Sequence, residues 1–410
     1  MKYDIIIIGG GASGLCTAIN AKKENNRVLL IEHGDRLGKK LLSTGNGKCN
    51  LTNMYCTPSL LNKNPEGIYP YFSSGKREFI ETVIAAFDAG KTVEFFKSLG
   101  ILTENKNGYV YPRSEQAASV LEILEKTCGE IGVDILLGCQ PFKVERFRGS
   151  GCRFIVDSEY ICRSLVLATG GMAAPGTGSD GSGYEIARAF GHHIVKPRPA
   201  LCAVRCSDKF FRDLSGVRCD GRVKLYDDEK REIISAYGNL QLNSYGISGI
   251  PVFQISSEFG RLLDAGVRPE IRLDFLPEFT EEKLAEYIET EKTWELTGLL
   301  NSRLAAVVRR EAAAAAEKHG RFTYAQICAA VIKRFRVHPV GLNSFAESQT
   351  TAGGVSTDEI NPETMESKLC KGLHFTGEIT DVNGICGGYN LQWAFSTACA
   401  AAKAVSGDRA

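Results

Sequence analysis

The chain begins with two apolar runs that flank one segment of helical composition. Residues 3–8 form a short apolar run in which four residues are isoleucine, as expected for a strand buried on both faces. Residues 15–25 have helix-forming composition, and residues 27–31 form a second apolar run. The pattern therefore predicts a strand, a helix and a second strand between Tyr3 and Glu32.

A glycine-rich turn joins the first strand to the helix. Gly9, Gly11 and Gly14 fit the spacing G-x-G-x-x-G, and Glu32 ends the second apolar run. In this motif the glycines allow a tight turn, close approach of a pyrophosphate and close packing of the helix, whose positive end faces the phosphates. The acid at the second strand end accepts hydrogen bonds from a ribose. We therefore predict a dinucleotide site rather than a plain glycine turn.

The pattern beyond residue 32 alternates between helices and strands. Helices are predicted at 79–99 (one or two), at 114–131 with residues 114–116 as cap, and at 183–190. Residues 133–137, 154–156 and 165–171 are predicted to form strands, and residues 176–181 form a second G-x-G-x-x-G without a strand leading into it. We interpret that second motif as a loop that serves the first cofactor.

The middle of the chain changes character at about residue 200. Residues 200–276 alternate apolar and polar positions between turns, which predicts an antiparallel β module. Helical periodicity follows to about residue 334, beginning at the cap Thr280 and including a capping box from Thr323 to Gln326. A strand at 373–377 and a final helix at about 390–405 complete the predicted elements.

Composition and charge narrow the class of protein. The 410 residues suit two or three domains, and 43% hydrophobic with 24% charged residues are ordinary for a globular protein. A net charge of +1 argues against a nucleic-acid or membrane surface as the main partner. No apolar run is long enough to cross a bilayer, and a strand begins at once. We therefore expect no membrane insertion, no signal peptide and a cytoplasmic protein.

The fourteen cysteines are scattered without any C-x-x-C spacing. This distribution favours reduced, mostly buried thiols over disulfides or a structural zinc site, so no metal is expected.

The C-terminal part supplies a second set of cofactor-binding features. Residues 377–384 and 387–394 have the pattern of a strand end, an acidic loop, a glycine turn and a helix start. Asp381 can accept hydrogen bonds from a ribityl hydroxyl, and the amides of residues 390–392 would stabilise negative charge on a reduced ring. This combination suits FAD.

Taken together, these motifs resemble one family. The N-terminal fingerprint, residues 41–53, 168–171 and 351–354, and the C-terminal block resemble the BaiN/RdsA-type NAD(P)/FAD-dependent oxidoreductases, flavoproteins distantly similar to fumarate reductases. The resemblance covers nearly the whole chain. It implies an α/β protein whose Rossmann-like FAD-binding domain is built from both chain ends, with a β-barrel-like insertion and a helical insertion.

The resemblance also implies boundaries and binding residues. The FAD domain would comprise residues 1–195 and 345–410, the β-barrel-like insertion 196–277 and about 336–344, and the helical insertion 278–335. The positions expected to bind FAD are Gly9, Gly11, Ala12, Ser13, Gly14, Glu32, Lys39, Lys40, Leu41, Thr44, Gly45, Asn46, Asn50, Val144, Ala168, Thr169, Gly170, Gly171, Gly377, Glu378, Asp381, Gly388, Tyr389, Asn390, Leu391 and Gln392.

Two positions depart from the family pattern. The glycine-rich loop often reads Ser-Gly-Gly-Gly-Arg-Cys-Asn, whereas residues 44–50 place Lys48 where the arginine stands. Lysine keeps the charge but loses the forked donor. The family's Ser-Gly-Pro is interrupted here by Ile250. Neither change identifies the substrate.

The chemistry expected from this resemblance is hydride transfer at a flavin. The leading hypothesis is a flavin reduced by NADH or NADPH that passes hydride from N5 to the C=C bond of a steroid-like or bile-acid-like enone. Candidate groups for carbonyl polarisation and proton delivery are Tyr389, Lys48, Tyr245, His338 and Arg334.

Two other hypotheses stay open at this point. The protein could be an amine oxidase that acts on a small amine such as aminoacetone, with oxygen as acceptor. It could also be a flavin-fold module that binds RNA or protein without redox turnover. The small molecule is the favoured partner, and oligomeric state is left unassigned.

Overall fold

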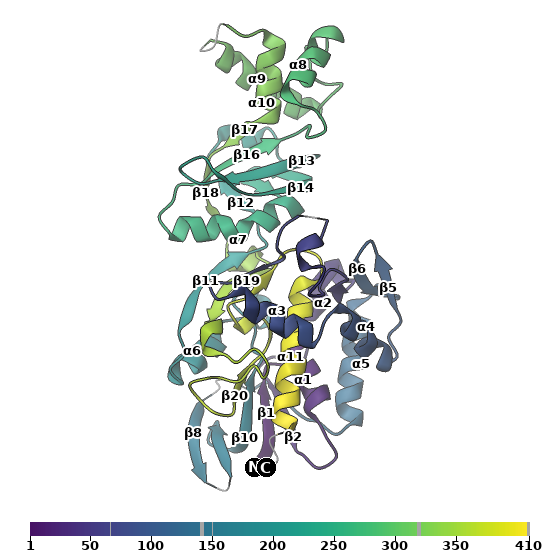
Figure 1. Ribbon diagram of the computed structural model, residues 1–410, viewed down its shortest axis with the longest axis vertical. Coiled ribbons are helices and arrows are strands. Elements are labelled where there is room, and N and C mark those ends of the chain that lie inside the picture. Colours follow the sequence, from purple (N-terminus) through teal and green to yellow (C-terminus); the bar gives the residue numbers. More distant parts are fainter. Residues whose placement is uncertain (66, 140–142, 150, 318–320, 408–410) are drawn as a thin grey trace. The chain divides into compact units, whose positions relative to one another are not determined.

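The computed structural model describes residues 1–65, 67–139, 143–149, 151–317 and 321–407 (Figure 1). These residues form two compact units. The first unit comprises Met1–Arg198 and the chain from Thr350 onward, and the second comprises Pro199–Gln349. The second unit is therefore an insertion in the first, which the chain completes only after returning from it.

A mixed sheet forms the centre of the first unit. The strands β1, β2, β7, β10 and β20 run parallel, whereas β9 and β8 form an antiparallel extension next to β10. The order is β7 (Asp134–Leu137), β2 (Val28–Glu32), β1 (Lys2–Ile8), β10 (Tyr160–Leu167), β9 (Cys152–Val156) and β8 (Val144–Gly149), with β20 (Leu373–Phe375) also beside β10. This is the Rossmann-like α/β fold that the sequence predicts.

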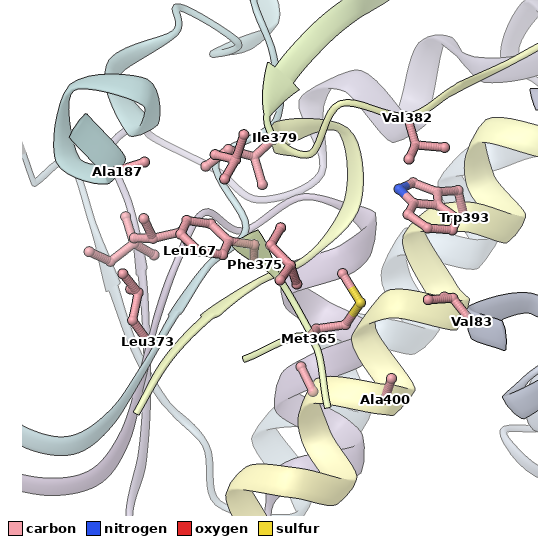
Figure 2. Close-up of a cluster of buried hydrophobic side chains, with 14 of the residues drawn as sticks. Val83, Leu167, Ala187, Met365, Leu373, Phe375, Ile379, Val382, Trp393 and Ala400 are labelled. Atoms are coloured by element: carbon pink, nitrogen blue, oxygen red, sulfur yellow. The ribbon is translucent and has the colours of Figure 1, made fainter. Parts of the chain in front are cut away.

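Both faces of this sheet are covered, as the isoleucine run predicts. Ile5 and Ile7 belong to one hydrophobic cluster and Ile6 and Ile8 to another, and all four are fully buried. Burial of such a side chain stabilises the fold by about 1.5–3 kcal/mol. Figure 2 shows part of the second cluster, where side chains from β10, β20, α3, α6 and α11 meet.

One helix of the first unit comes from the C-terminal part of the chain and packs beside the N-terminal helix. The C-terminal helix α11 packs along α1, and α5 packs against α1 as well (Figure 1). The helices are α1 (Ala12–Ala21), α2 (Lys39–Ser43), α3 (Arg77–Ala86), α4 (Ala89–Ser98), α5 (Ala117–Glu130), α6 (Ser182–Ala189) and α11 (Tyr389–Gly407). None of the helices in the described ranges is long and apolar enough to cross a membrane.

The predicted cap of α5 is wrong. The helix begins at Ala117 with Gln116 as N-cap, and no side chain caps it. Ser114 and Glu115 instead precede the helix, and Glu115 has the left-handed backbone angle φ 51°. Its carboxylate pairs with Lys48 and Lys106. Glu115 thus forms ion pairs with Lys48 and Lys106 and does not belong to the first turn of the helix.

Three small sheets bring loops together around the main sheet. Except for the hairpin of residues 103–112, they pair segments that lie far apart in sequence, such as residues 71–72 with 383–384. Their strands are β3 (Thr52–Asn53), β6 (Tyr109–Pro112) and β5 (Thr103–Lys106); β21 (Asn383–Gly384) and β4 (Tyr71–Phe72); and β11 (Ile194–Ala200) with β19 (Thr350–Val355).

The second unit contains a seven-stranded antiparallel sheet, confirming the predicted β module. The two strands at the ends of the order, β17 and β18, are consecutive in sequence with only His338 between them. The order is β17 (Phe335–Val337), β16 (Glu270–Asp274), β13 (Val217–Tyr226), β14 (Glu232–Asn243), β15 (Gly246–Ser248), β12 (Val204–Cys206) and β18 (Pro339–Leu342).

The purely β interpretation of residues 200–276 missed one helix. Helix α7 (Ile250–Asp264) packs on β14 and buries residues such as Val252, Ile255, Phe259 and Leu262. That spacing of three and four is the helical signal, and it lies directly after Pro251, which favours a first helical turn.

Three further helices follow in the second unit. They are α8 (Glu281–Thr290), α9 (Ser302–Ala316) and α10 (Tyr324–Lys333), and α10 packs on both others. The predicted caps are confirmed: the Thr280 hydroxyl accepts a bond from the Lys283 amide, and Thr323 and Gln326 form a capping box.

Candidate functional site

The glycine turn lies where β1 and β10 end side by side. The chain proceeds from β1 to β2 on one side, and β10 lies on the other, so this edge is a topological switch point. A Cβ on Gly9 would lie 2.4 Å from the Ala168 carbonyl oxygen, and one on Gly14 would lie 1.8 Å from the Gly9 oxygen. A Cβ on Gly11 would meet nothing within 4 Å. The turn is thus tightly packed on two sides and open at Gly11.

Glu32 closes β2 next to this turn. Its two carboxylate oxygens accept bonds from the Gly10 and Gly34 amides, each at 2.7 Å. A carboxylate has about four lone-pair sites, so the two remaining ones can accept ribose hydroxyls. The position agrees with the role expected for the acid of a dinucleotide fingerprint.

An ion pair connects the N-terminal loop to the C-terminal block. The Lys40 Nζ lies 2.8 Å from the Glu378 Oε2, although the two residues are 338 positions apart. The Glu378 Oε1 also accepts a bond from the Thr351 amide at 2.9 Å. Lys39 pairs with Asp35 at 2.6 Å within its own loop. Lys40 and Glu378 therefore hold three separate segments together.

The loop after α2 has an unusual backbone. Gly45, Asn46, Gly47 and Cys49 all have left-handed φ angles, between 55° and 84°. The Cys49 amide donates to the Thr44 carbonyl at 3.0 Å, which closes the loop. Successive turns of this kind present backbone N–H groups in a concave surface, as in anion-binding loops.

Asn50 anchors this loop to the glycine turn before α11. With its amide oriented so that both groups are paired, Asn50 donates to the Val110 and Thr52 carbonyls at 3.1 and 2.9 Å and accepts from the Gly388 amide at 3.2 Å. The side chain is buried. These bonds give Asn50 a role in shaping the site.

The start of α11 is fixed by two amide side chains. Asn390 accepts from the Gly384 amide and donates to the Gly384 carbonyl, at 2.8 and 2.9 Å. Gln392 is fully buried and bonds to Thr52, Thr92, Ser396 and the Phe87 carbonyl. The first amides of α11 lack partners within the helix, so they present positive partial charge.

Asp381 is a buried acid in the same block. It is 3% exposed and accepts bonds from the Ser74 amide at 2.8 Å and from the Ser74 hydroxyl. Burial raises the pKa of its carboxyl, and the bonds from Ser74 oppose that rise. No local signal pointed to Ser74, because it lies 307 residues away in sequence.

The remaining expected positions spread around these residues. The side chain of Ser13 lies at the start of α1, where its hydroxyl points to the Thr376 carbonyl at 3.4 Å. Leu41 is buried in α2, and Leu391 packs against the same cluster from α11. Val144 begins β8 opposite Val156. The others follow β1, β10 and β20 directly along the chain: Ala12, Ala168, Thr169, Gly170, Gly171 and Gly377.

The chemical character of this edge fits a flavin dinucleotide. Helix α1 begins at an open glycine turn, a carboxylate stands at the end of β2, and α11 presents its N-terminus. The buried oxygens of Thr169, Thr376 and Tyr184 have no hydrogen-bond partner in the described protein. A ligand with many hydroxyl, phosphate and ring acceptors can satisfy such groups. The residues present at this edge therefore fit FAD.

The five candidate catalytic side chains lie in different surroundings. Tyr389 is buried and packs edge-on to Tyr71, with ring centroids 5.9 Å apart. Lys48 is half exposed and pairs with Glu115 at 2.8 Å. The pairs with Lys106 and Lys48 lower the pKa of Glu115 to about 2.

Tyr245 and His338 belong to the second unit. Tyr245 is 41% exposed in the turn between β14 and β15. His338 is exposed, and Asp208 holds it: one carboxylate oxygen lies 2.6 Å from its Nδ1, and the other accepts its backbone N–H at 2.7 Å.

His338 also lines a cavity of about 1240 Å³ within the second unit. Its apolar surface comes from α10 and its neighbours, including Phe210, Ile327 and Phe335. Arg334, another candidate, lies here and pairs with Glu281 at 2.6 Å. Carboxylates predominate in the lining: Asp208, Glu281, Glu282, Glu286, Glu289 and Glu311. This acidity disfavours an anionic ligand in the cavity.

The thiols of Cys49 and Cys56 are both buried. Burial raises the pKa of Cys49 and of Cys56 to about 12, so both thiols are protonated at neutral pH. No disulfide occurs in the described part of the chain. Among these residues, no group of three or more His, Cys, Asp or Glu side chains could hold a metal ion.

Comparison with known families identifies the fold and its lineage. Residues 3–404 match the HI0933-like protein Rossmann domain. The chain belongs to the HI0933-like family. It is 36% identical to the 3-dehydro-bile acid delta(4,6)-reductase of Clostridium scindens, with 98% of each chain covered. It is 30% identical to the ribosomal RNA dihydrouridine synthase of Haemophilus influenzae, again with 98% of each covered.

A solved structure supports the fold of this HI0933-like protein. The 3-ketosteroid delta1-dehydrogenase of Sterolibacterium denitrificans matches with a TM-score of 0.52 and 12% identity, covering all of both chains. At that identity the match concerns the fold alone. With the family match and the site above, the protein is an FAD-dependent oxidoreductase.

Proposed function

We propose that the protein uses FAD to reduce a carbon–carbon double bond conjugated to a carbonyl, with NADH or NADPH as the source of electrons. The observation that carries this proposal is the 36% identity, over 98% of both chains, to a 3-dehydro-bile acid delta(4,6)-reductase. The relatives named as dihydrouridine synthases support the same bond type, because uridine also has a double bond conjugated to a carbonyl. A bile-acid-like enone is the first candidate substrate.

The residues of the site would have separate tasks. When bound, FAD supplies hydride transfer between nicotinamide and substrate. The open turn at Gly11 and the N-terminus of α1 would bind its pyrophosphate, and Glu32 its ribose. Asp381 would bind a ribityl hydroxyl, with Ser74 holding the carboxylate in place. The first amides of α11 would stabilise negative charge at the ring.

A side chain that donates a proton to the substrate must be accessible to it. Tyr389 is buried and packs against the aromatic ring of Tyr71, so its main role is in packing rather than in proton transfer. Lys48, Tyr245 and His338 are exposed enough to meet a substrate, and we propose them in that role. Individual substitutions to Met, Phe and Gln, respectively, should leave reduction of the flavin by nicotinamide intact. Only loss of the proton donor should slow turnover with the enone.

RNA is a second candidate substrate. Two relatives, 30% and 29% identical over 98% of this chain, are named ribosomal RNA dihydrouridine synthases. The net charge of +1 does not provide the strong positive field typical of nucleic-acid binding. We therefore place the bile-acid-like enone before uridine in RNA.

One experiment separates these functions. The FAD-loaded protein is titrated anaerobically with NADH and then NADPH while flavin absorbance is followed. Saturable bleaching is expected. The reduced protein is then mixed with a 3-oxo-Δ4,6 bile acid or with ribosomal RNA that lacks dihydrouridine, and return of the oxidised spectrum identifies the acceptor.

The remaining outcomes discriminate equally clearly. If neither nicotinamide reduces the flavin, but aminoacetone does so and peroxide forms in air, the protein is an amine oxidase and the proposal falls. If FAD does not bind, both enzyme hypotheses fall. A Gly11→Ala variant, expected to fold but to bind FAD more weakly, controls for reduction that does not involve the site.

A further inference from the structure

The cavity of the second unit lies outside the residues that the FAD site uses. Its volume is about 1240 Å³, and its lining comes from α8, α9, α10 and the neighbouring strands β16 and β17. Helices α8 and α9 both pack on α10 (Figure 1). All of the lining residues belong to Pro199–Gln349, so one compact unit forms the whole cavity. Small-molecule sites usually measure about 300–1,000 Å³, so the cavity has room for a drug-sized ligand.

Part of the cavity wall is apolar. Ile327 and Val331 contribute from α10, and Phe335 contributes from β17. Phe322 also lines the cavity and is 59% exposed, which leaves much of its ring free to contact a ligand. An aromatic ring can pack on an apolar body, and its face attracts a cation.

The arginines of the lining already have carboxylate partners. Arg334 pairs with Glu281 at 2.6 Å, and Arg272 and Arg336 both pair with Glu270. These positive charges are therefore compensated within the protein, and they leave little attraction for an anionic ligand.

Three glutamates of α8 line the same cavity and lack such compensation. Glu282, Glu286 and Glu289 follow the spacing i, i+4 and i+7, which places them on one face of the helix. In the described part of the chain none of the three forms an ion pair. His338 does not supply the missing charge, because Asp208 holds it. The uncompensated charge of the cavity is thus negative.

We propose that this cavity binds an amphipathic organic cation, namely an amine with an apolar body that is protonated at neutral pH. Its ammonium group pairs with Glu286 and Glu289, and its apolar body packs on Ile327, Val331 and Phe322. A neutral ligand of the same shape gains only the apolar contacts, and an anionic one is repelled. The inference is independent of the proposed flavin chemistry, because the residues expected to bind FAD all belong to the first unit.

The test uses three compounds that share a phenylbutyl body and differ in charge: 4-phenylbutylamine, 4-phenylbutanol and 4-phenylbutyrate. Isothermal titration calorimetry measures their binding to the full-length, FAD-loaded protein at neutral pH. The amine should bind saturably, with a dissociation constant about three- to tenfold below that of the alcohol, and the butyrate should bind most weakly. Added salt should weaken binding of the amine, because screening acts on its ion pairs.

The double variant Glu286→Gln, Glu289→Gln removes two uncompensated charges and keeps the size of both side chains. It should raise the dissociation constant of the amine about three- to tenfold, to that of the alcohol, and leave the alcohol unaffected. Glu291→Gln is the matched control, because it removes the same charge at the C-cap of α8 from a residue that does not line the cavity. This control should leave binding of all three compounds unchanged.

Three results would overturn the inference. The amine could fail to bind saturably, it could bind no more tightly than the alcohol, or its affinity could survive the double substitution. The last two would show that the acidic face of α8 is only a solvated surface. None of these results bears on the flavin, whose reduction by nicotinamide is measured separately.

Discussion

Alanine substitutions at Gly11 and Gly14 should separate cofactor binding from folding. Both glycines belong to the same turn, but a Cβ at Gly14 would stand 1.8 Å from the Gly9 carbonyl oxygen, whereas one at Gly11 would meet nothing within 4 Å. Gly11 also has φ −81°, which alanine readily adopts. The two methyl groups therefore press on different partners: protein at Gly14 and ligand at Gly11.

The structure sets the size of each effect. Ordinary contact begins at 3.4 Å, so α1 must move by about 1.6 Å away from β1 to accept Gly14→Ala. Overpacking of that kind costs about 1–3 kcal/mol. At Gly11 the loss of a glycine N-cap and the reduced entropy of the unfolded chain oppose each other, and the net change should stay within about 1 kcal/mol.

The assay measures both quantities on the same samples. Thermal unfolding without FAD should show Gly14→Ala lower by several degrees and Gly11→Ala near wild type. FAD titration should show Gly11→Ala weakened by roughly 10- to 100-fold, if about 1–3 kcal/mol of overpacking falls on the ligand. A Gly11→Ala protein that binds FAD as tightly as wild type would refute the placement of the pyrophosphate over this turn.

Three further predictions concern other parts of the first unit. Burial lowers the pKa of His192, so below about pH 6.5 the unfolded state binds more protons than the folded state, and the free energy of unfolding should fall. Denaturant titrations at several pH values should show that His192→Gln flattens this part of the stability–pH curve. An unchanged curve would contradict the prediction. Gln392→Ala should lower the free energy of unfolding by about 3 kcal/mol or more, because it leaves the buried hydroxyl of Thr92 and other partners unpaired. Urea unfolding measures this loss. A loss below about 1 kcal/mol would argue against the importance of this buried hydrogen-bond network. Cys49 and Cys56, whose pKa values burial raises to about 12, should resist a thiol reagent at pH 8 until the protein is unfolded, and rapid labelling of either in the native state would contradict their burial.

The sequence was most informative where the cause of structure is local. The apolar run of residues 3–8 forms a strand buried on both faces, and the capping box at Thr323 and Gln326 forms as predicted. Helix α7 was missed although Val252, Ile255 and Phe259 follow helical spacing, because the surrounding segment alternates like a strand. The prediction gave the strand-like alternation of every second residue more weight than the helical spacing of three and four residues.

The site was less predictable because its contacts join distant segments. Nothing near Lys40 indicates Glu378 as its partner, 338 residues away, and nothing near Asp381 indicates Ser74. The start of α5 is a further example, because Glu115, which was predicted to belong to the cap, pairs with Lys48, 67 residues away in sequence. Sequence motifs therefore identify the segments of the site, whereas their mutual hydrogen bonds emerge only in the folded chain.

The insertion of the second unit into the first has a consequence for synthesis. Glu378, Asp381 and helix α11 are made after residues 199–349, so the nascent chain can complete the second unit before the first has its cofactor edge. Until then β10 lacks its neighbour β20, and α1 lacks α11. The surfaces of Met1–Arg198 that β20 and α11 cover are therefore completed only by residues made after the second unit, and the same holds for the cofactor edge.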